Sequence, residues 1–317
     1  MPKQILVGVP TYRDFYRIDT LLSSLEDVTS PEDYERLNIV VLDDGTPDQD
    51  IVEGLKEACQ YHKVGFIQHH QNKGIPAAWN SLARAGIEDI IILFNDDIML
   101  CNPDWVKCIE YFLRHNEMVG GVGFPLIQVA ADGTRSNEAS AGIMANAWGT
   151  KPGRCGAPVG CSFGFTREAF NLVDFPERYK SFQEESNWGF RLAEKGWLSY
   201  MLHYPPMEHH GSQTFAQNPE LSFCKFEIGD KDEYKAVLRK CCLHRPDFIA
   251  HSLKLLDEQN IVYRMDYSRY LMAKEWGVLD SYDCPQVPIH KRIVDPWEPR
   301  LIRWLDGNLN ECEGFIG

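Results

Sequence analysis

Two adjacent carboxylates, Asp96 and Asp97, directly follow the apolar run Ile90–Phe94 and are the most distinctive chemical feature of the sequence. Negative charge at the rim of a hydrophobic sheet is energetically costly unless a cation neutralises it or hydrogen-bond donors contact it. A hard divalent ion holding a diphosphate would do so, because carboxylate and phosphate oxygens can share its coordination sphere. The alternative is that the pair only caps the loop before Asn102-Pro103.

Short apolar runs alternate with amphipathic stretches through the first half of the chain, which is typical of βαβ units. Polar residues collect where the apolar runs end, and in open α/β sheets the carboxyl ends of the strands form the ligand-binding edge. The predicted strands are Ile5–Val9, Asn38–Leu42, Val64–Gln68 and Ile90–Phe94, and the predicted helices are Arg17–Leu25, Ile51–His62, Ile75–Ala85 and one opened by Pro103.

The second half of the chain has a different pattern. The stretch Val119–Gly160 is rich in Gly, Ala, Ser and Asn and predicts loops around short strands. After Phe215 the alternation stops, so we predict a domain over residues 1–215 and a mostly helical C-terminal extension over 216–317. The helices predicted in this extension are Asp230–Leu243, Phe248–Gln259 and Tyr267–Trp276.

Composition limits the class of protein. Of 317 residues, 44% are hydrophobic and 25% charged, which excludes wholesale disorder. The net charge of −14 gives no broad basic surface for nucleic acid, so small molecules, metal ions or neutral acceptors are the expected partners. The ten cysteines contain no C-x-x-C pair, which argues against a zinc knuckle and a secreted disulfide framework.

The sequence also predicts the cellular location of the protein. No stretch approaches the roughly 18 apolar residues that a membrane span needs. The amino-terminal run before Pro10 is typical of a buried strand rather than a signal peptide. We therefore expect a cytoplasmic protein with no integral membrane segment.

Four short motifs, each following a predicted strand, resemble those of the family 2 glycosyltransferases of the GT-A fold. They are Pro10-Thr11-Tyr12, Asp43-Asp44-Gly45-Thr46, Asn72-Lys73-Gly74 and Asn95-Asp96-Asp97. The resemblance runs from about Ile5 to about Phe215. It implies a Rossmann-like α/β domain whose mainly parallel sheet is flanked by helices. It also implies metal-dependent transfer of a sugar from a UDP- or dTDP-sugar to an acceptor hydroxyl. Inversion at the anomeric carbon is the expected outcome, although retaining GT-A enzymes share the sheet and the metal motif.

The resemblance assigns roles on the donor side. Asp44, with Asp43 beside it, matches the aspartate that hydrogen-bonds uracil or thymine. Asp97 matches the aspartate that binds Mn²⁺ or Mg²⁺, and Asp96 is expected to contact the ribose or the sugar. The nucleotide-sugar-binding residues implied are Pro10, Thr11, Tyr12, Asp43, Asp44, Asn72, Gly74, Asn80 and Asp96.

A second block resembles the acceptor side of the same family. It comprises Gly160–Phe163, Thr166–Phe170 and Glu184–Arg191, and the family's usual form in the last part is Glu-Asp-x-Asp. This chain has Glu185 and Asn187 where aspartates are usual. Glu185, with Glu184 beside it, is therefore the implied catalytic base, and we expect the helix dipole to keep this carboxylate ionised. The alternative is an acid pair that only caps a solvated helix.

A histidine downstream of this element often ligates the metal in the family, and His209 is the match, with His210 second. Imidazole suits Mn²⁺ better than Mg²⁺. Adjacent residues of a strand point to opposite faces, so only one of the two should ligate. The alternative is that the pair is only a surface feature.

Two other functions stay open. A metal-dependent nucleotidyltransferase would share the acidic strand ends, but Gly8-Val9-Pro10-Thr11 is a poor version of its phosphate loop. A non-catalytic sugar-nucleotide-binding protein would keep Glu185 as a remnant. The acceptor could be a glycan, a lipid-linked molecule, a protein or a modified nucleobase. Trp297 and Trp304 predict that the tail packs on the main domain or on a second subunit, as in a homodimer formed through the C-terminal extension.

Overall fold

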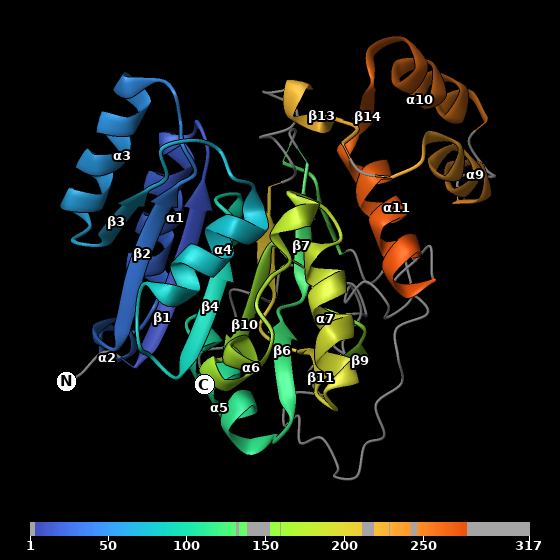
Figure 1. The fold of residues 1–317 in the computed structure, drawn as a ribbon. Helices are drawn as coiled ribbons and strands as arrows, with labels where there is room; N and C mark the ends of the chain where they lie inside the picture. Colours follow the sequence, from blue (N-terminus) through green and yellow to red (C-terminus); the bar gives the residue numbers. More distant parts are fainter. Residues whose placement is uncertain are drawn as a thin grey trace.

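The computed structural model describes residues 4–130, 133–137, 153–158, 160–210, 219–227, 229–241 and 246–277. An eight-stranded sheet in the order β3-β2-β1-β4-β10-β6-β11-β9 runs through the molecule (Figure 1). Neighbours among β3, β2, β1 and β4 are parallel, whereas β10 is antiparallel to both β4 and β6. The strands are β1 (Ile5–Thr11), β2 (Leu37–Asp43), β3 (Gly65–Gln68), β4 (Ile90–Phe94), β6 (Val119–Gly123), β9 (Gly153–Cys155), β10 (Ser162–Thr166) and β11 (Leu198–Met201).

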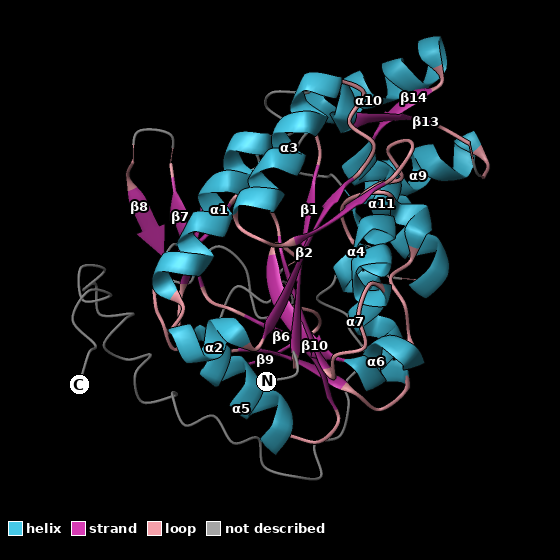
Figure 2. Cartoon of the chain, turned by 90° about the vertical axis from the view of Figure 1, so that its left-hand side faces the viewer, coloured by secondary structure: helices cyan, strands magenta, loops and turns pink. Residues whose placement is uncertain are grey.

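Helices cover both faces of this sheet, which Figure 2 shows edge-on. Every residue of β1 and β4 is buried, as expected for parallel strands covered on two sides. Alternate side chains enter two cores: Val7 packs with α1, α3 and α5, and Leu6 packs with α4, α6 and α7. These helices are α1 (Phe15–Val28), α3 (Gln49–Tyr61), α4 (Ile75–Arg84), α5 (Trp105–His115), α6 (Arg167–Leu172) and α7 (Glu184–Glu194), with the short α2 (Pro31–Glu35) before β2.

A second, four-stranded sheet has the order β5-β12-β7-β8. Its strand β12 brings Met207–His209 beside β5, so that His209 is paired with Ile98 just after the acidic pair of β4. The sequence predicted short strands in this region but not this second sheet, which joins segments more than 100 residues apart. The strands are β5 (Ile98–Leu100), β7 (Leu126–Val129), β8 (Arg135–Asn137) and β12 (Met207–His209).

The C-terminal extension is packed on the α7 side of the main domain (Figure 1). Its apolar core is shared, because Tyr179 and Phe190 of the first domain pack in one cluster with Tyr270 and Met272. The tail with Trp297 and Trp304 lies outside the described residues, and no helix among those described is long and apolar enough to cross a membrane. The remaining elements are η2 (Glu177–Tyr179), η3 (Pro219–Ser222), β13 (Phe223–Lys225), α9 (Lys231–Cys241), α10 (Pro246–Gln259), β14 (Ile261–Tyr263) and α11 (Arg264–Trp276).

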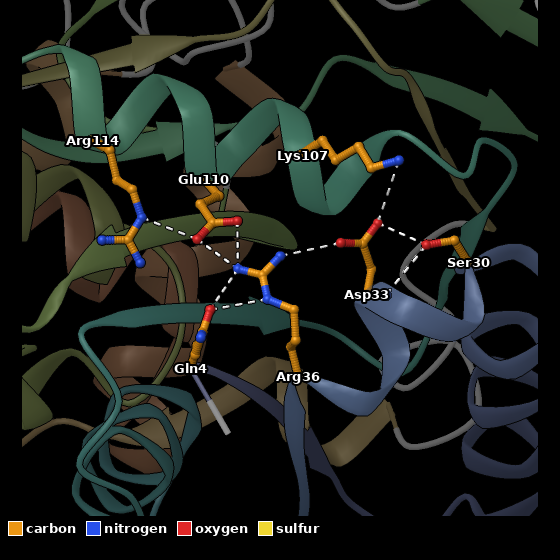
Figure 3. A network of polar contacts seen from close by, with 7 residues as sticks. All are labelled: Gln4, Ser30, Asp33, Arg36, Lys107, Glu110 and Arg114. Carbon is orange, nitrogen blue, oxygen red and sulfur yellow. Dashed lines mark hydrogen bonds and ion pairs between the residues drawn. The ribbon is translucent and has the colours of Figure 1, made fainter. Parts of the chain in front are cut away.

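A polar network ties the elements together at the amino ends of β1 and β2 (Figure 3). Arg36 contacts Asp33 of α2 at 3.2 Å and Glu110 of α5 at 2.6 Å. Its Nε also donates to Gln4 Oε1 at 2.9 Å. Ser30 and Lys107 contact the other oxygen of Asp33, and Arg114 Nε donates to Glu110 Oε1, which Arg36 also contacts. All the carboxylate oxygens in this network therefore have partners.

The α/β fold predicted from the sequence is confirmed. The predicted helices and strands of the first hundred residues all exist, and their ends differ by a few residues at most. The helix opened by Pro103 begins at Trp105 in the structure. The predicted boundary near residue 215 stays a prediction, because the shared core described above crosses it.

Candidate active site

A cavity of about 280 Å³ lies at the carboxyl ends of β1, β2 and β4. The turn after each strand contributes polar side chains, and the start of α7 closes the opposite side. The cavity is lined by most of the residues that the sequence indicated. These are Pro10, Thr11, Tyr12, Asp44, Asn72, Gly74, Asp96, Asp97, Glu184, Glu185 and His209.

Asp44 organises the loop on the donor side. Its Oδ1 lies 2.7 Å from His69 Nδ1 and accepts from Lys73 N at 3.0 Å, and its Oδ2 accepts from Gly74 N at 2.8 Å. Burial raises the pKa of Asp44, and these hydrogen bonds partly oppose the rise. Gly45 lets the loop approach closely, since a Cβ there would lie 2.2 Å from the backbone of Gln71. No pattern in the sequence indicated that His69 is the partner of Asp44.

Two residues expected in the donor site lie outside the cavity lining. Asp43 is fully buried and accepts from Thr46 N at 3.1 Å and from Gln68 Nε2 at 3.0 Å, so it holds the turn after β2. The amide of Asn80 bonds both backbone groups of Phe175, each at 2.9 Å. In the structure α4 uses the Asn80 side chain to anchor the segment before η2, and a contact of Asn80 with the donor stays a prediction.

The acidic pair after β4 is buried against the turn after β1. Thr11 Oγ1 donates to Asp96 Oδ2 at 2.7 Å. Burial, together with the charge of Asp97, raises the pKa of Asp96 to about 7. Asp97 Oδ1 is buried and has no hydrogen-bond partner among the described residues, and its Oδ2 lies 3.4 Å from His209 Nε2. Asp97 thus presents a buried acceptor to the cavity.

The two histidines of β12 and its end face different cavities. His209 lines the cavity of Asp44 and Glu185. His210 lines a second cavity of about 490 Å³ near Arg17, which shares Asp96 and Asp97 with the first. His209 Nδ1 lies 2.8 Å from Gln128 Oε1. If Nδ1 donates to this oxygen, the lone pair of the neutral imidazole is on Nε2, the nitrogen nearer Asp97.

These residues fit a divalent ion only in part. No group of three or more His, Cys, Asp or Glu side chains among the described residues could hold a metal by itself. Asp97 and His209 offer two ligands, and Asp97 Oδ1 is an orphaned buried acceptor. Mg²⁺ and Mn²⁺ in nucleotide sites commonly use few protein ligands and take the rest from phosphate and water. The chain therefore suits an ion that arrives with a phosphate-bearing ligand.

Glu184 and Glu185 begin α7 and both line the cavity. Burial, reinforced by the charge of Glu185, raises the pKa of Glu184 well above its usual value, and Glu184 Oε2 has no hydrogen-bond partner among the described residues. Burial also raises the pKa of Glu185 to about 7, although backbone N–H groups of the first turn oppose it. The expectation that the helix dipole keeps Glu185 ionised is corrected, because burial outweighs it. A carboxyl group with this pKa can accept a hydroxyl proton near neutral pH.

Asn187 is turned away from the cavity toward the C-terminal extension. Its Nδ2 donates to Glu275 Oε2 at 2.8 Å and to Tyr179 Oη at 2.9 Å. Trp188, the next residue, is fully buried in the core. The departure from the usual aspartate at position 187 is therefore matched by an acidic neighbour on α11.

Several residues of the cavity lining were not predicted from the sequence. Ile75 and Trp79 belong to α4. Lys180, Ser181 and Phe182 precede α7, and Leu221 and Arg264 belong to the C-terminal extension. Helical periodicity predicted most of α11 but began that helix at Tyr267, so Arg264 was not considered. No local pattern in the sequence indicates that this extension folds back over the site.

Comparisons with known proteins agree with this geometry. The family model described as "Glycosyl transferase family 2" matches residues 6–173. No curated protein matches the sequence. Among solved structures, TarS from S. aureus (residues 1–349) is similar with a TM-score of 0.51 and 12% identity, over 87% of this chain and 92% of that one. GalNAc-T7, solved with UDP, GalNAc and Mn²⁺, is similar with a TM-score of 0.53 and 14% identity, over 90% of this chain and 58% of that one.

At these sequence identities the structural neighbours establish the fold alone, which is the GT-A fold of glycosyltransferases. The family match decides against the nucleotidyltransferase alternative. Because that match covers more than half of the 317 residues, the chain belongs to glycosyl transferase family 2.

Proposed function

We propose that this protein transfers a sugar from a UDP- or dTDP-sugar to an acceptor hydroxyl, with a divalent ion at Asp97 and His209 and with Glu185 as the base. The observation that carries the proposal is the composition of one cavity. Asp97 and His209 lie on its wall with Asp44, and it also contains Glu185, a partly buried carboxyl group whose pKa is raised to about 7. A sugar donor and an acceptor bound in this cavity would both lie beside the metal ligands and the base.

The loop around Asp44 supports a pyrimidine donor. Asp44 Oδ1 already accepts two hydrogen bonds, whereas Oδ2 accepts one from Gly74 N. A carboxylate oxygen has about two acceptor positions, so Oδ2 keeps one. The N3–H of uracil or thymine is a donor that this position would accept. Tyr12 and Pro10, which line the same cavity, would pack on the base.

The metal would be held by Asp97 and His209 together with the donor's diphosphate. Its chemical contribution when bound would be to neutralise the charge that develops on the departing diphosphate. GalNAc-T7, which shares the fold, was solved with UDP and Mn²⁺. The chain's own part is to supply two ligands and to keep Asp96 buried beside them, held by Thr11.

Glu185 would act on the acceptor. As the acceptor oxygen bonds to the anomeric carbon, the proton of that hydroxyl passes to Glu185 and the bond from the anomeric carbon to the diphosphate oxygen breaks. Attack from the face opposite the leaving group inverts the configuration. Glu184 shares the cavity, where burial and the charge of Glu185 raise its pKa well above that of a usual carboxyl group.

A calorimetric titration of the full chain with UDP, with and without Mn²⁺, tests the proposal. We expect UDP to bind much more tightly with Mn²⁺, and Asp97→Ala to remove this difference without lowering the unfolding temperature of the free protein. Asp48→Ala is a suitable control, because Asp48 is an exposed residue at the start of α3 outside the cavity. Equal affinity with and without the ion in the parent protein would refute the metal assignment.

A further inference from the structure

Arg264 lies in the C-terminal extension, far beyond residues 6–173 that the family model matches, yet it lines the same cavity as Asp97 and Glu185. It is the first residue of α11, directly after the short strand β14. A cationic side chain from this helix therefore reaches the place where a nucleotide sugar would react.

The cavity needs positive charge to hold a diphosphate. Its described lining includes only two Lys or Arg side chains, Lys180 and Arg264. The Lys180 ammonium donates to Lys73 O at 3.2 Å on the exposed rim. A diphosphate would add charge to a lining that already carries five carboxyl groups, namely those of Asp44, Asp96, Asp97, Glu184 and Glu185.

The Arg264 side chain has an N–H donor with no acceptor among the described residues. Its Nε is buried, and no described residue accepts a hydrogen bond from it. Buried donors are rarely left without a partner in folded proteins, and arginine stays charged at any physiological pH. The planar guanidinium matches the paired oxygens of a phosphate group, which it can bind through two parallel N–H groups.

The position of Arg264 is coupled to that of the proposed base. One turn further along α11, Ser268 Oγ donates to Ser181 O at 2.9 Å. Ser181 lies in the segment before α7, in which Lys180, Phe182 and Gln183 all have φ between 61° and 67°. Such left-handed backbone is costly outside glycine, so contacts like that of Ser268 must hold it. Helix α11 thus positions both Arg264 and the start of α7.

We propose that Arg264 binds the diphosphate of the donor, and that α11 of the C-terminal extension is for this reason part of the active site. The inference rests on the proposed function, since it takes a nucleoside diphosphate as the ligand. It adds a donor-binding residue to the site and gives the C-terminal extension a direct role in the reaction.

The test is a calorimetric comparison of UDP and uridine, each with Mn²⁺, on the full-length parent protein and its variants. For Arg264→Ala we expect UDP affinity to fall by about 10- to 100-fold, the usual worth of hydrogen bonds to a charged group, while uridine affinity stays unchanged. Arg264→Lys should lose less UDP affinity than Arg264→Ala, because lysine keeps the positive charge. It should still lose some, because lysine lacks the two parallel N–H groups of the guanidinium. The matched control is Arg269→Ala, on the same helix and outside the cavity, where Arg269 lies 3.7 Å from Asp266.

The outcomes separate this inference from the proposed function. If the parent protein binds UDP and Arg264→Ala binds it equally well, or loses uridine affinity to the same extent, the inference is wrong and the proposed function stands. If the parent protein binds no nucleoside diphosphate, both are wrong. Thermal melts of the free variants check folding, and Arg264→Gln, which keeps the length of the side chain without its charge, takes the place of the alanine variant if that variant melts early.

Discussion

Two clusters of buried carboxylates lie at opposite ends of the same parallel strands and behave differently. At the amino ends, burial pulls the pKa of Glu110 upward, but hydrogen bonds from Arg36 and Arg114 outweigh it and the pKa is lowered. At the carboxyl ends, burial raises the pKa of both Asp96 and Glu185 to about 7. The first cluster is shown in Figure 3.

Both clusters contain buried acids, so the difference between their pKa values comes from the hydrogen-bond and ion-pair partners of those acids. The carboxylates around Arg36 have cationic or hydroxyl partners at every oxygen, whereas Asp97 and Glu184 each keep a buried oxygen with no partner among the described residues. Unpaired buried acids lower the stability of the fold, so they persist where a ligand or a reaction needs them. Of these two clusters, the one at the carboxyl edge is therefore the one that holds buried carboxylate oxygens without partners.

The largest effect that the comparison predicts is on catalysis. Glu185→Gln keeps the shape of the side chain and removes its basicity. Sugar transfer should therefore fall by roughly 10²- to 10⁴-fold, the usual contribution of a general base, with UDP affinity nearly unchanged. Donor turnover with UDP-sugars and calorimetry with UDP measure the two quantities.

Glu184→Gln is the matched control for this experiment. Adjacent helical residues point about 100° apart, so one of the two faces the reacting atoms more directly. We expect the smaller loss from Glu184→Gln. If Glu184→Gln is the inactive variant, the base is Glu184; if neither variant loses activity, the inverting mechanism with a base on α7 is wrong.

A substitution in the cluster around Arg36 should change the stability of the protein rather than its catalysis. Arg36→Ala leaves Asp33 and Glu110 buried without their common partner, and we expect about 3 kcal/mol less free energy of unfolding. UDP affinity should not change, since the network lies at the other end of the strands. Urea denaturation measures the loss. Arg114→Ala, which removes a half-exposed partner of Glu110, should cost under about 1 kcal/mol, and equal losses would contradict the central place of Arg36.

The pH dependence of stability should also differ between the clusters. The Glu185 carboxyl group has a folded pKa of about 7 against an ordinary value of 4.5, so the folded protein binds more protons than the unfolded chain between these values. The free energy of unfolding should therefore fall as pH rises from about 4.5 to about 7, by about 2 kcal/mol after allowance for solvent screening. Thermal melts of Glu185→Gln should show a smaller decline, because Asp96, whose pKa is also raised to about 7, still titrates in this range. The activity of the parent protein should rise with pH through the same range. A decline of equal size in both proteins would show that Glu185 does not contribute to it.

Much of the fold could be predicted from the sequence because its signals are local. The runs Ile5–Val9 and Ile90–Phe94 are apolar on both faces and bounded by polar residues, which is enough to place them as buried parallel strands. The site motifs follow from the same fact, since the ends of parallel strands meet at one edge. Pro10, Asp44 and Asp97 line one cavity for this reason.

The parts that the sequence did not predict depend on long-range contacts. The pairing of Asp44 with His69 and the anchoring of Phe175 by Asn80 join segments whose separation carries no periodic signal. The ionisation of Glu185 was expected from its helix position alone, but burial by neighbours from other segments decides it. Arg264 was missed because nothing local shows that α11 folds back over the cavity.

The smallest predicted effect tests how α11 is attached to α7. Asn187→Asp would place a carboxylate at the position of the amide nitrogen that now lies 2.8 Å from Glu275 Oε2. Repulsion between these two acids should lower the free energy of unfolding by about 1 kcal/mol, and Tyr179 Oη, which can donate to either one, keeps the loss small. Glu275→Gln in the same chain should restore the stability, because a neutral amide can donate to the new carboxylate. Denaturation of the two single variants and the double variant measures this coupling, and additive losses would show that Asn187 and Glu275 do not act as a pair.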